Sequence, residues 1–428
     1  MSTSHKASKT PQDGQLIDIP HILRAGATLS AILSPTPLQH CKRLSERYQA
    51  NIYLKREDLQ EVRSFKIRGA YHKIANLSEA EKANGVVCAS AGNHAQGVAY
   101  SCNKLNIQGT IFMPKGTPNQ KVRKVKNFGG TKVKVELVGA NFDEAKEASE
   151  AFCRERGSTY VHPFDDPYTI AGQGTIAKEI YDHATFRPDV ILASIGGGGM
   201  VAGISIYSKG VSPDTRIIGV EAEGQDSMSQ SLKVGKIITL GRLDTFAEGT
   251  AVKTVGKLNF DICQRYLDDI KIVETGHVCT ELIDLYQNEG IIAEPSGAIP
   301  LAALSQLAQE IKGKNVVCVI CGGNNDILRY PEIMEKSLLW QGLKHYFIVN
   351  FSQRPGELKR LVNDVLSSNE DIVLFEYIKK NNKEKGPALL GIELSQADDL
   401  DGLLARFDEH KIDHHKIDPD DAYYSILL

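Results

Sequence analysis

The stretch Asp189-Val190-Ile191-Leu192-Ala193-Ser194-Ile195-Gly196-Gly197-Gly198-Gly199-Met200 joins an apolar run to four consecutive glycines. The run from Val190 to Ser194 has the length and composition of a buried strand, and the residues after the glycines continue as a helix. Glycine lets the backbone approach a ligand closely, and successive N–H groups at a helix N-terminus bind anions. The stretch therefore predicts a strand–loop–helix unit that binds a phosphate. A flexible turn is the alternative, and a dinucleotide site fits less well because the G-x-G-x-x-G spacing is absent.

The same order of strand and helix recurs along most of the chain. Strands are expected at 51–55, 85–89, 109–113, 131–138, 190–194, 216–220 and 315–320, and helices at 17–33, 91–105, 119–128, 141–156, 278–288 and 300–311. Near-continuous apolar strands that alternate with helices predict parallel sheets with both faces covered. We therefore predict an α/β fold, whose ligands lie at the carboxyl ends of the strands.

The last part of the chain has a different pattern. Strands are expected at 343–351, 371–379 and 387–394, helices at about 355–367 and 398–409, and a turn at 381–386. This β-α-β-β-α order is typical of a small ferredoxin-like module. The predicted organisation is a disordered tail over 1–16, a catalytic domain over 17–335 and a small domain over 342–418.

Composition excludes several classes of protein. The 428 residues are 42% hydrophobic and 24% charged, as in ordinary globular proteins, and the net charge of −3 gives no broad attraction to nucleic acid or anionic membranes. No apolar run is long enough to span a bilayer, and the polar N-terminus does not have the apolar segment of a signal peptide. A cytoplasmic protein is expected. The eight cysteines are predicted to be free thiols, because the C-x-x-C of Cys318 and Cys321 lacks a second ligand pair for a metal.

A second stretch, Ser64-Phe65-Lys66-Ile67-Arg68-Gly69-Ala70, places a lysine between an aromatic and a β-branched residue. Apolar neighbours disfavour the ammonium form of lysine, so they favour the nucleophilic amine. The carbonyl of pyridoxal phosphate is the usual partner of such an amine. Taken alone, Lys66 is more simply interpreted as a solvated surface charge, and the case for chemistry depends on the motifs elsewhere in the chain.

Three further motifs are placed where a strand ends and a helix begins. The segment from Ser90 to Gly97, SAGNHAQG, offers hydroxyl, amide and imidazole groups at a helix start, which suits a carboxylate and a phenolic oxygen. An ordinary helix cap is an equally good interpretation of this segment alone. Cys321 ends an apolar strand before Gly-Gly-Asn-Asn, where a weak donor would meet a ring nitrogen, although a buried structural cysteine is the simpler interpretation. The third motif, EPSGA, begins at Glu294.

With these motifs in this order, the chain resembles the fold-type II pyridoxal-phosphate enzymes, and within them the threonine dehydratase (threonine ammonia-lyase) family. The resemblance covers nearly the whole chain after about residue 20. It implies two parallel α/β subdomains followed by a ferredoxin-like, ACT-like regulatory domain. It also implies cofactor contacts at Phe65, Lys66, Asn93, Gly196, Gly197, Gly198, Gly199, Met200 and Cys321, substrate contacts at Ser90, Asn93, His94 and Glu294, and no metal ligands.

The resemblance assigns roles to these residues. Lys66 carries the covalent link to pyridoxal 5'-phosphate and then acts as general base, Asn93 bonds the phenolic oxygen, and the glycine loop holds the phosphate. Phe65 packs against the ring. Cys321 faces the pyridine nitrogen, where the family usually has serine, and a thiol is a weaker donor.

The implied reaction is β-elimination of L-threonine to 2-oxobutanoate and ammonia, the first step of isoleucine biosynthesis, with isoleucine as the expected inhibitor. A homotetramer or homodimer is expected. A catabolic serine/threonine dehydratase, a serine racemase and a non-enzymatic amino-acid sensor are the alternatives. The module that begins at Arg354-Pro355-Gly356 favours the feedback-controlled enzyme, and an intact Lys66 and Asn93 argue against the sensor.

Overall fold

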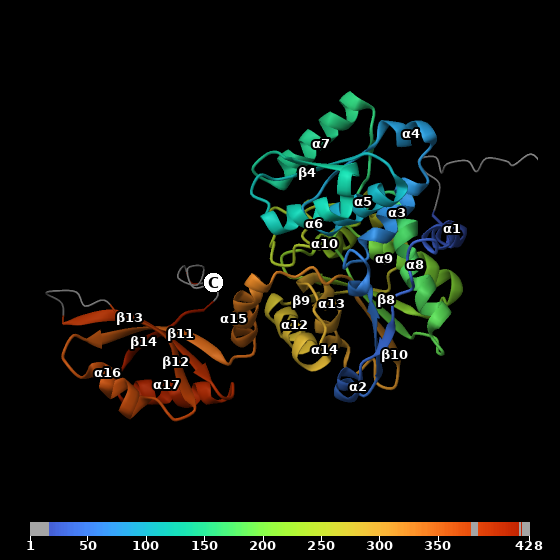
Figure 1. The fold of residues 1–428 in the computed structure, drawn as a ribbon. Helices are drawn as coiled ribbons and strands as arrows, with labels where there is room; N and C mark the ends of the chain where they lie inside the picture. Colours follow the sequence, from blue (N-terminus) through green and yellow to red (C-terminus); the bar gives the residue numbers. More distant parts are fainter. Residues whose placement is uncertain (1–16, 378–383, 419–420, 422–428) are drawn as a thin grey trace, which may run out of the picture. The chain divides into compact units, whose positions relative to one another are not determined.

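The computed structural model describes residues 17–377, 384–418 and 421 (Figure 1). The disordered tail predicted over 1–16 and residues 381–383 of the turn predicted at 381–386 lie outside these residues. Contacts within the chain divide it into two compact units. The first contains residues 17–274 and 285–325, and the second contains residues 275–284 and the described residues from 326 onward.

The larger sheet of the first unit has six strands in the order β1-β2-β10-β7-β8-β9. All neighbours in it are parallel except β1 and β2. Its strands are β1 (Leu38–His40), β2 (Asn51–Arg56), β7 (Val190–Ser194), β8 (Arg216–Ala222), β9 (Asp269–Val273) and β10 (Asn315–Ile320). Every residue of β7 is buried, as the apolar sequence predicts for a central parallel strand.

The smaller sheet of this unit is entirely parallel, in the order β5-β4-β3-β6. Its strands are β3 (Val86–Ala89), β4 (Gly109–Met113), β5 (Val133–Leu137) and β6 (Thr159–Tyr160). Side chains of α3 (Lys66–Ala75), α5 (Asn93–Leu105) and α6 (Asn119–Gly129) share one core with these strands, and α7 (Phe142–Arg156) packs against Val87, Ala89 and Phe112. The prediction of two parallel α/β subdomains is therefore confirmed.

Two long helices, α8 (Pro167–His183) and α9 (Gly199–Val211), pack on the larger sheet together with α1 (Ile19–Leu29). The helix α8 was not predicted. The two helices touch at glycines: a Cβ on Gly203 would lie 2.4 Å from the Ile170 carbonyl oxygen and 2.6 Å from the Gly174 nitrogen. The other helices of the first unit are α2 (Lys42–Tyr48), α4 (Glu79–Asn84), α10 (Ser227–Val234), α11 (Lys257–Tyr266), α13 (Pro295–Ala302), α14 (Leu304–Leu307), and α12 (Thr275–Glu289), which the unit division crosses.

The helix predicted over 300–311 is wrong at its start. The helix α13 begins at Pro295, which occupies a first-turn position, and Pro300 lies inside it. Proline is favoured in a first turn because the N–H that it lacks has no partner there. The chain then ends α13 at Ala302, and the short helix α14 follows it.

The second unit contains α15 (Tyr330–Trp340) and a four-stranded antiparallel sheet in the order β12-β13-β11-β14. Its strands are β11 (Lys344–Ser352), β12 (Glu370–Tyr377), β13 (Lys385–Leu394) and β14 (Asp413–Lys416), the last of which was not predicted. The helices α16 (Glu357–Arg360) with η4 (Leu361–Val365), and α17 (Asp399–Glu409), share one core with the sheet. This β-α-β-β-α-β order and strand order give the ferredoxin-like module that was predicted.

Candidate active site

Lys66 begins α3 beside the carboxyl end of β10. The segment before it pairs with the residues after β10, through a bridge between Ser64 and Gly322 and a bond of 3.1 Å from the Phe65 N–H to the Cys321 carbonyl. On the other side, a Cβ on Gly97 of α5 would lie 3.1 Å from the Lys66 carbonyl carbon. The Lys66 backbone is therefore fixed between the end of the larger sheet and a helix of the smaller one.

The Lys66 amine has the properties of a nucleophile. It donates a hydrogen bond of 2.8 Å to the Pro163 carbonyl and lies 5.2 Å from the centroid of the Phe65 ring. Burial disfavours the ammonium form and lowers the pKa of Lys66 to about 8, although Cys321 and Glu294 act in the opposite direction. A substantial fraction of the amine is therefore neutral near physiological pH.

Asn93 and Glu294 are hydrogen-bonded to each other, and Glu294 and Cys321 both lie near the Lys66 amine. The Asn93 amide donates to both oxygens of Glu294, at 2.8 and 3.0 Å, and the Ser296 hydroxyl donates to one of them at 2.9 Å. The Ser194 and Ser296 side chains lie close enough to the Cys321 thiol to favour its thiolate form. Burial raises the pKa of Cys321 to about 12, so the thiol stays protonated, and burial also raises the pKa of Glu294.

The glycine loop is tightly enclosed. A Cβ on Gly197 would lie 2.2 Å from the Phe164 ring, and a Cβ on Gly196 would lie 2.9 Å from the Thr250 Cα. Gly198 has a φ of +93°, which other residues rarely adopt, and α9 starts directly after it. The Asn259 amide donates to the Gly197 carbonyl at 2.8 Å and holds the loop in place. Its N–H groups at the start of α9 are the donors that an anion needs.

The remaining predicted residues lie at two helix starts. The Ser90 hydroxyl accepts a bond of 3.2 Å from the Gly92 N–H, directly before α5. The His94 ring bonds the Val161 carbonyl at 2.8 Å and is buried, and burial lowers its pKa to about 3. Its side chain therefore has a structural role, and only its backbone N–H at the start of α5 is placed to bind a carboxylate. Met200 is buried in the first turn of α9.

Several residues of the site were not predicted. Asn324 donates to Asn93 at 2.7 Å, and Ser296 donates to Glu294. Asn324 follows Cys321 in the segment Cys-Gly-Gly-Asn-Asn, and Ser296 belongs to the motif EPSGA, so both had a signal in the sequence. Pro163, Phe164 and Asn259 have no comparable signal, because they enter the site only through the folding of distant segments.

The donor set fits pyridoxal phosphate. An amine with a lowered pKa suits the carbonyl, an amide suits the phenolic oxygen, the glycine N–H groups suit the phosphate, and a protonated thiol suits the ring nitrogen. We assign Lys66, Asn93, Gly196–Met200 and Cys321 to these four contacts as the residues that would hold the cofactor. The structure brings Lys66, Asn93, Glu294 and Cys321 together independently of this assignment.

Comparison with known proteins agrees with this chemistry. The family described as pyridoxal-phosphate dependent enzyme matches residues 29–322. The chain is 48% identical to the biosynthetic L-threonine dehydratase of Bacillus subtilis, over 97% of this chain and 99% of that protein. The chain belongs to the threonine dehydratase family of pyridoxal-phosphate enzymes. Residues 335–427 match the C-terminal regulatory domain of threonine dehydratase, a family feature that coincides with the ferredoxin-like module.

Other relatives in the family extend the comparison. The biosynthetic L-threonine dehydratase of Corynebacterium glutamicum is 47% identical over 100% of both chains. The processed form of threonine deaminase isoform 2 from Solanum lycopersicum is 36% identical, covers 77% of this chain and 99% of its own, and superposes with a TM-score of 0.70. Maize serine racemase, at 30% identity, covers 76% of this chain and 99% of its own with a TM-score of 0.70.

Cys321→Ser is expected to retain turnover within about twofold of the unchanged protein. Serine keeps a donor at this position, and a hydroxyl is a stronger donor than a thiol. Cys321→Asp is expected to increase side reactions, because a carboxylate raises the proton affinity of the ring nitrogen. Steady-state kinetics with the visible spectrum of the bound cofactor measure both effects. Loss of turnover in Cys321→Ser with the cofactor still bound would contradict the placement of Cys321 at the ring.

Proposed function

We propose that the protein catalyses the β-elimination of L-threonine to 2-oxobutanoate and ammonia and that it serves isoleucine biosynthesis. The observation that carries this proposal is the 48% identity to a biosynthetic L-threonine dehydratase, which extends over 97% of the chain and includes the regulatory domain. The amine of Lys66, near Glu294 and its partner Asn93, supplies the nucleophile and the base that this reaction needs.

Each residue has a separate task. Bound pyridoxal phosphate supplies an electron-withdrawing ring that stabilises negative charge at the substrate Cα. Lys66 would hold the carbonyl of the cofactor, and its free amine would be placed to take the proton from the substrate Cα as general base. Ser90 and the N–H groups at the start of α5 bind the carboxylate of threonine. Loss of hydroxide from Cβ leaves an enamine, and its hydrolysis gives 2-oxobutanoate and ammonia.

The neutral thiol of Cys321 favours elimination over competing reactions, and the orientation of Asn93 is fixed by its neighbours. Cys321 is a neutral thiol. A carboxylate in its place would stabilise the protonated ring nitrogen, and a protonated ring would spread the negative charge of the substrate Cα further. The thiol does not have this effect. Asn93 is held from both sides, by Glu294 at 2.8 Å and by Asn324 at 2.7 Å, so its amide is oriented before the substrate binds.

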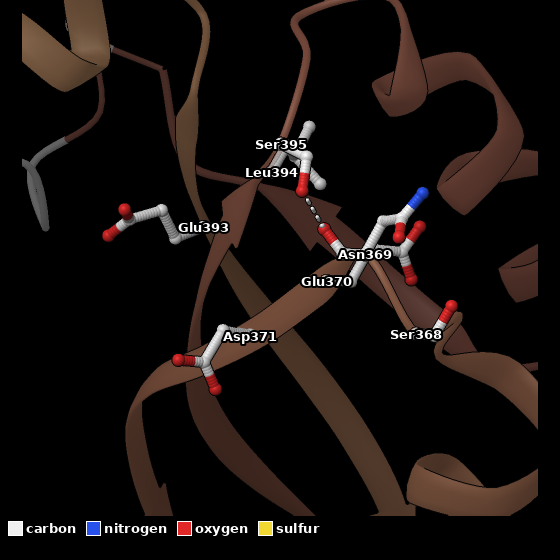
Figure 2. Close-up of a pocket in the computed structure, with 7 residues that line it drawn as sticks. All are labelled: Ser368, Asn369, Glu370, Asp371, Glu393, Leu394 and Ser395. Carbon is white, nitrogen blue, oxygen red and sulfur yellow. Dashed lines mark hydrogen bonds between the residues drawn. The ribbon is translucent and has the colours of Figure 1, made fainter.

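We also propose that isoleucine inhibits the enzyme through the regulatory domain, that the protein is a homotetramer or homodimer, and that it acts in the cytoplasm. Among the described residues, no helix has the length and apolar character needed to cross a membrane. The domain has a pocket of about 410 Å³ where β12 begins and β13 ends (Figure 2). It is lined by Ser368, Asn369, Glu370, Asp371, Glu393, Leu394 and Ser395, and none of these seven residues is a cation that would bind an amino-acid carboxylate. We therefore do not assign isoleucine to this pocket.

A chain that ends at Gly342 tests the regulatory part of the proposal. We expect the full chain to convert threonine and to lose apparent affinity for it when isoleucine is present, by roughly fivefold to a hundredfold for a coupling of about 1–3 kcal/mol. The shortened chain is expected to keep turnover and to ignore isoleucine. The shortened chain retains Trp340, whose ring stacks on the His277 ring with 4.2 Å between the centroids. The Trp340 ring therefore still covers His277 in the shortened chain.

The same assay separates the alternatives. Serine is tested beside threonine, because a racemase would release D-serine and a catabolic dehydratase would accept both substrates without isoleucine control. If the full chain turns over threonine but binds no isoleucine by calorimetry, the biosynthetic assignment fails. If it binds isoleucine and turns over neither substrate, the sensor is the better description.

A further inference from the structure

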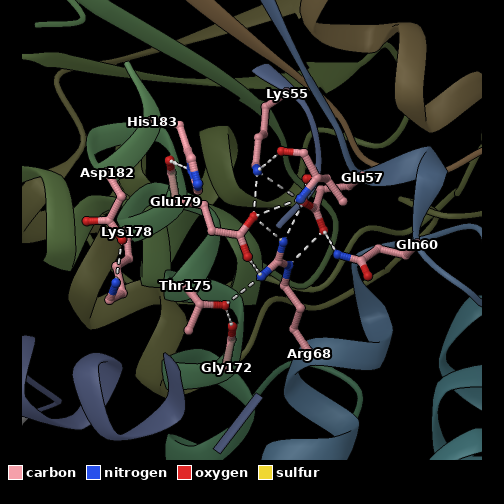
Figure 3. Close-up of polar contacts among 11 residues, drawn as sticks. Lys55, Glu57, Gln60, Arg68, Gly172, Thr175, Lys178, Glu179, Asp182 and His183 are labelled. Carbon is pink, nitrogen blue, oxygen red and sulfur yellow. Dashed lines mark hydrogen bonds and ion pairs between the residues drawn. The ribbon is translucent and has the colours of Figure 1, made fainter. Parts of the chain in front are cut away.

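A cluster of four charged side chains is buried beneath the Lys66 helix, outside the proposed cofactor contacts (Figure 3). Arg68 of α3 lies at its centre, and Glu57, Glu179 and Lys55 surround it. Arg68, Glu57 and Lys55 are at most 1% exposed, and the Glu179 side chain is 14% exposed. Removing four charged groups from water costs free energy. Buried ion pairs often stabilise a fold no more than apolar side chains of the same size would. We therefore expect from the geometry of the cluster a role other than stabilising the fold.

All five N–H donors of Arg68 have acceptors. Two of its bonds reach the two oxygens of Glu57, at 2.7 and 2.8 Å, and two reach the oxygens of Glu179, at 2.6 and 2.8 Å. The fifth reaches the Thr175 hydroxyl at 3.0 Å. A planar guanidinium with two forked carboxylate pairs is fixed in position and in rotation, because each fork sets a plane. A lysine ammonium does not impose this geometry.

The charges of the cluster balance. Lys55 bonds Glu179 at 2.5 Å and the Thr36 carbonyl at 2.7 Å, and the Thr36 hydroxyl donates to Glu57 at 2.6 Å. Two cations therefore face two carboxylates. Arg68 holds the pKa of Glu57 below its usual range, and the two carboxylates raise the pKa of Arg68.

The cluster joins the Lys66 helix to α8 at the point where the two helices touch. A Cβ on Gly69 would lie 2.8 Å from the Thr169 carbonyl oxygen, and a Cβ on Gly172 would lie 2.7 Å from the Arg68 carbonyl oxygen. Both helices therefore meet backbone to backbone directly after Lys66. The glycines permit this contact, but they do not set the angle at which α3 lies on α8. The fork of Arg68 to Glu179 and its bond to Thr175, both on α8, supply that constraint, and the fork to Glu57 ties Arg68 to the segment after β2.

The residues that lead into α8 touch the active site. Pro163 accepts the hydrogen bond from the Lys66 amine at 2.8 Å, and the Phe164 ring packs against Gly197 of the phosphate loop. Any rotation of α8 against α3 therefore moves the acceptor of the Lys66 amine and the wall of the glycine loop together.

We propose that Arg68, through its forked bonds to Glu57 and Glu179, is a positioning residue that sets where the Lys66 amine stands relative to Pro163 and the glycine loop. The inference rests on the proposed function for its kinetic readout. It does not depend on that function for its spectroscopic readout, because the visible absorbance of the bound cofactor reports the lysine without turnover.

The test compares Arg68→Lys and Glu179→Gln with the unchanged full chain, each loaded with pyridoxal phosphate. Arg68→Lys keeps the charge and loses both forks. Glu179→Gln keeps the shape and loses one carboxylate. Both variants are expected to lower kcat for threonine by about tenfold or more, because small misplacement of a reacting group is costly, while KM stays within about twofold. The pKa of the pH-dependent change in cofactor absorbance is expected to move by more than about half a unit.

Two controls separate positioning from stability. Asp268→Asn breaks a partly buried pair with Lys209 at the amino end of the larger sheet, where Asp268 also accepts the Ile217 N–H at 2.7 Å. It is expected to lower the melting temperature and to leave kcat and the absorbance pKa unchanged. The double variant Lys55→Met/Glu179→Gln restores charge balance, so its melting temperature is expected to recover relative to Glu179→Gln while kcat stays low.

Recovery of kcat and of the absorbance pKa together with the melting temperature in the double variant would overturn the proposal. So would single variants that behave like Asp268→Asn. Where Arg68→Lys does not fold, Thr175→Val removes one acceptor of Arg68 without any change of charge, and a smaller shift in the same direction is expected. If the unchanged chain does not turn over threonine, the proposed function fails, and the absorbance comparison still decides the role of Arg68.

Discussion

Lys66→Ala is expected to abolish threonine turnover, with a loss of at least about a thousandfold, and to remove the visible absorbance of the lysine-bound cofactor. The variant deletes the only nucleophile assigned to the site and also the base that removes the proton from Cα. Its folding is expected to survive, because the variant gives up the hydrogen bond from the amine to the Pro163 carbonyl while the Lys66 backbone remains held by Gly97. Steady-state kinetics, visible spectra and thermal melting measure the three properties.

The matched control is Lys209→Ala, which removes another partly buried amine from the same unit. The Lys209 amine donates to the Thr215 carbonyl at 2.8 Å and to Asp268 at 2.7 Å. These contacts lie at the amino ends of the strands of the larger sheet, whereas Lys66 lies beside the carboxyl end of β10. This variant is expected to melt earlier and to keep full turnover. Borohydride reduction of the unchanged protein, followed by peptide mapping, identifies the labelled lysine directly. A pyridoxyl label on a different lysine would refute the assignment of Lys66.

A pH experiment follows from the lowered pKa of Lys66. In the full chain without cofactor, the neutral fraction of this amine rises through a pKa of about 8, whereas an exposed lysine remains charged until about pH 10. Competitive labelling with an amine reagent is therefore expected to modify Lys66 in preference to exposed lysines between about pH 7 and 9. Labelling that follows an ordinary lysine profile would show that the amine is better solvated than its surroundings indicate.

The strands and the positions of the motifs were predictable because they depend on short-range patterns. A buried parallel strand such as β7 is apolar at every position, and a glycine loop or a helix start is visible within a few residues. The ferredoxin-like module was recognisable from the order of its elements, although β14 (Asp413–Lys416) has the sequence Asp-His-His-Lys, with no apolar residue to identify it.

The contacts around Lys66 were not predictable, because their partners are separated by about a hundred residues or more. Pro163 lies 97 positions from Lys66, Glu179 lies 111 positions from Arg68, and Glu294 lies 201 positions from Asn93. The helix α8 was missed since ten of its residues are buried, so it lacks the polar stripe by which an amphipathic helix is recognised. Pro163 and Phe164 lie just before this helix, so their place in the site leaves no periodic signal either.

Gly197→Ala is expected to weaken binding of pyridoxal phosphate by about tenfold to a hundredfold. The new Cβ would lie 2.2 Å from the Phe164 Cγ and 2.4 Å from two further ring atoms, which no side chain can tolerate without movement. Forcing an extra carbon into a packed site costs about 1–3 kcal/mol, a span of about fivefold to 150-fold in affinity that includes this range. The cost falls on the phosphate loop, because Asn259 fixes the Gly197 carbonyl at 2.8 Å and prevents the loop from moving away.

The Phe164 ring determines how this result is interpreted. The double variant Gly197→Ala/Phe164→Leu makes room for the new methyl group, so it is expected to recover most of the lost cofactor affinity, although it loses the contact between the Phe164 and His162 rings at 4.7 Å. Gly116→Ala is the control, because a Cβ there meets nothing within 4 Å. Titration of the cofactor-free full chain with pyridoxal phosphate, followed by absorbance, measures all three. If Gly197→Ala binds the cofactor as tightly as Gly116→Ala, then the phosphate is not held by this loop, and the cofactor must be placed elsewhere along the carboxyl ends of the larger sheet.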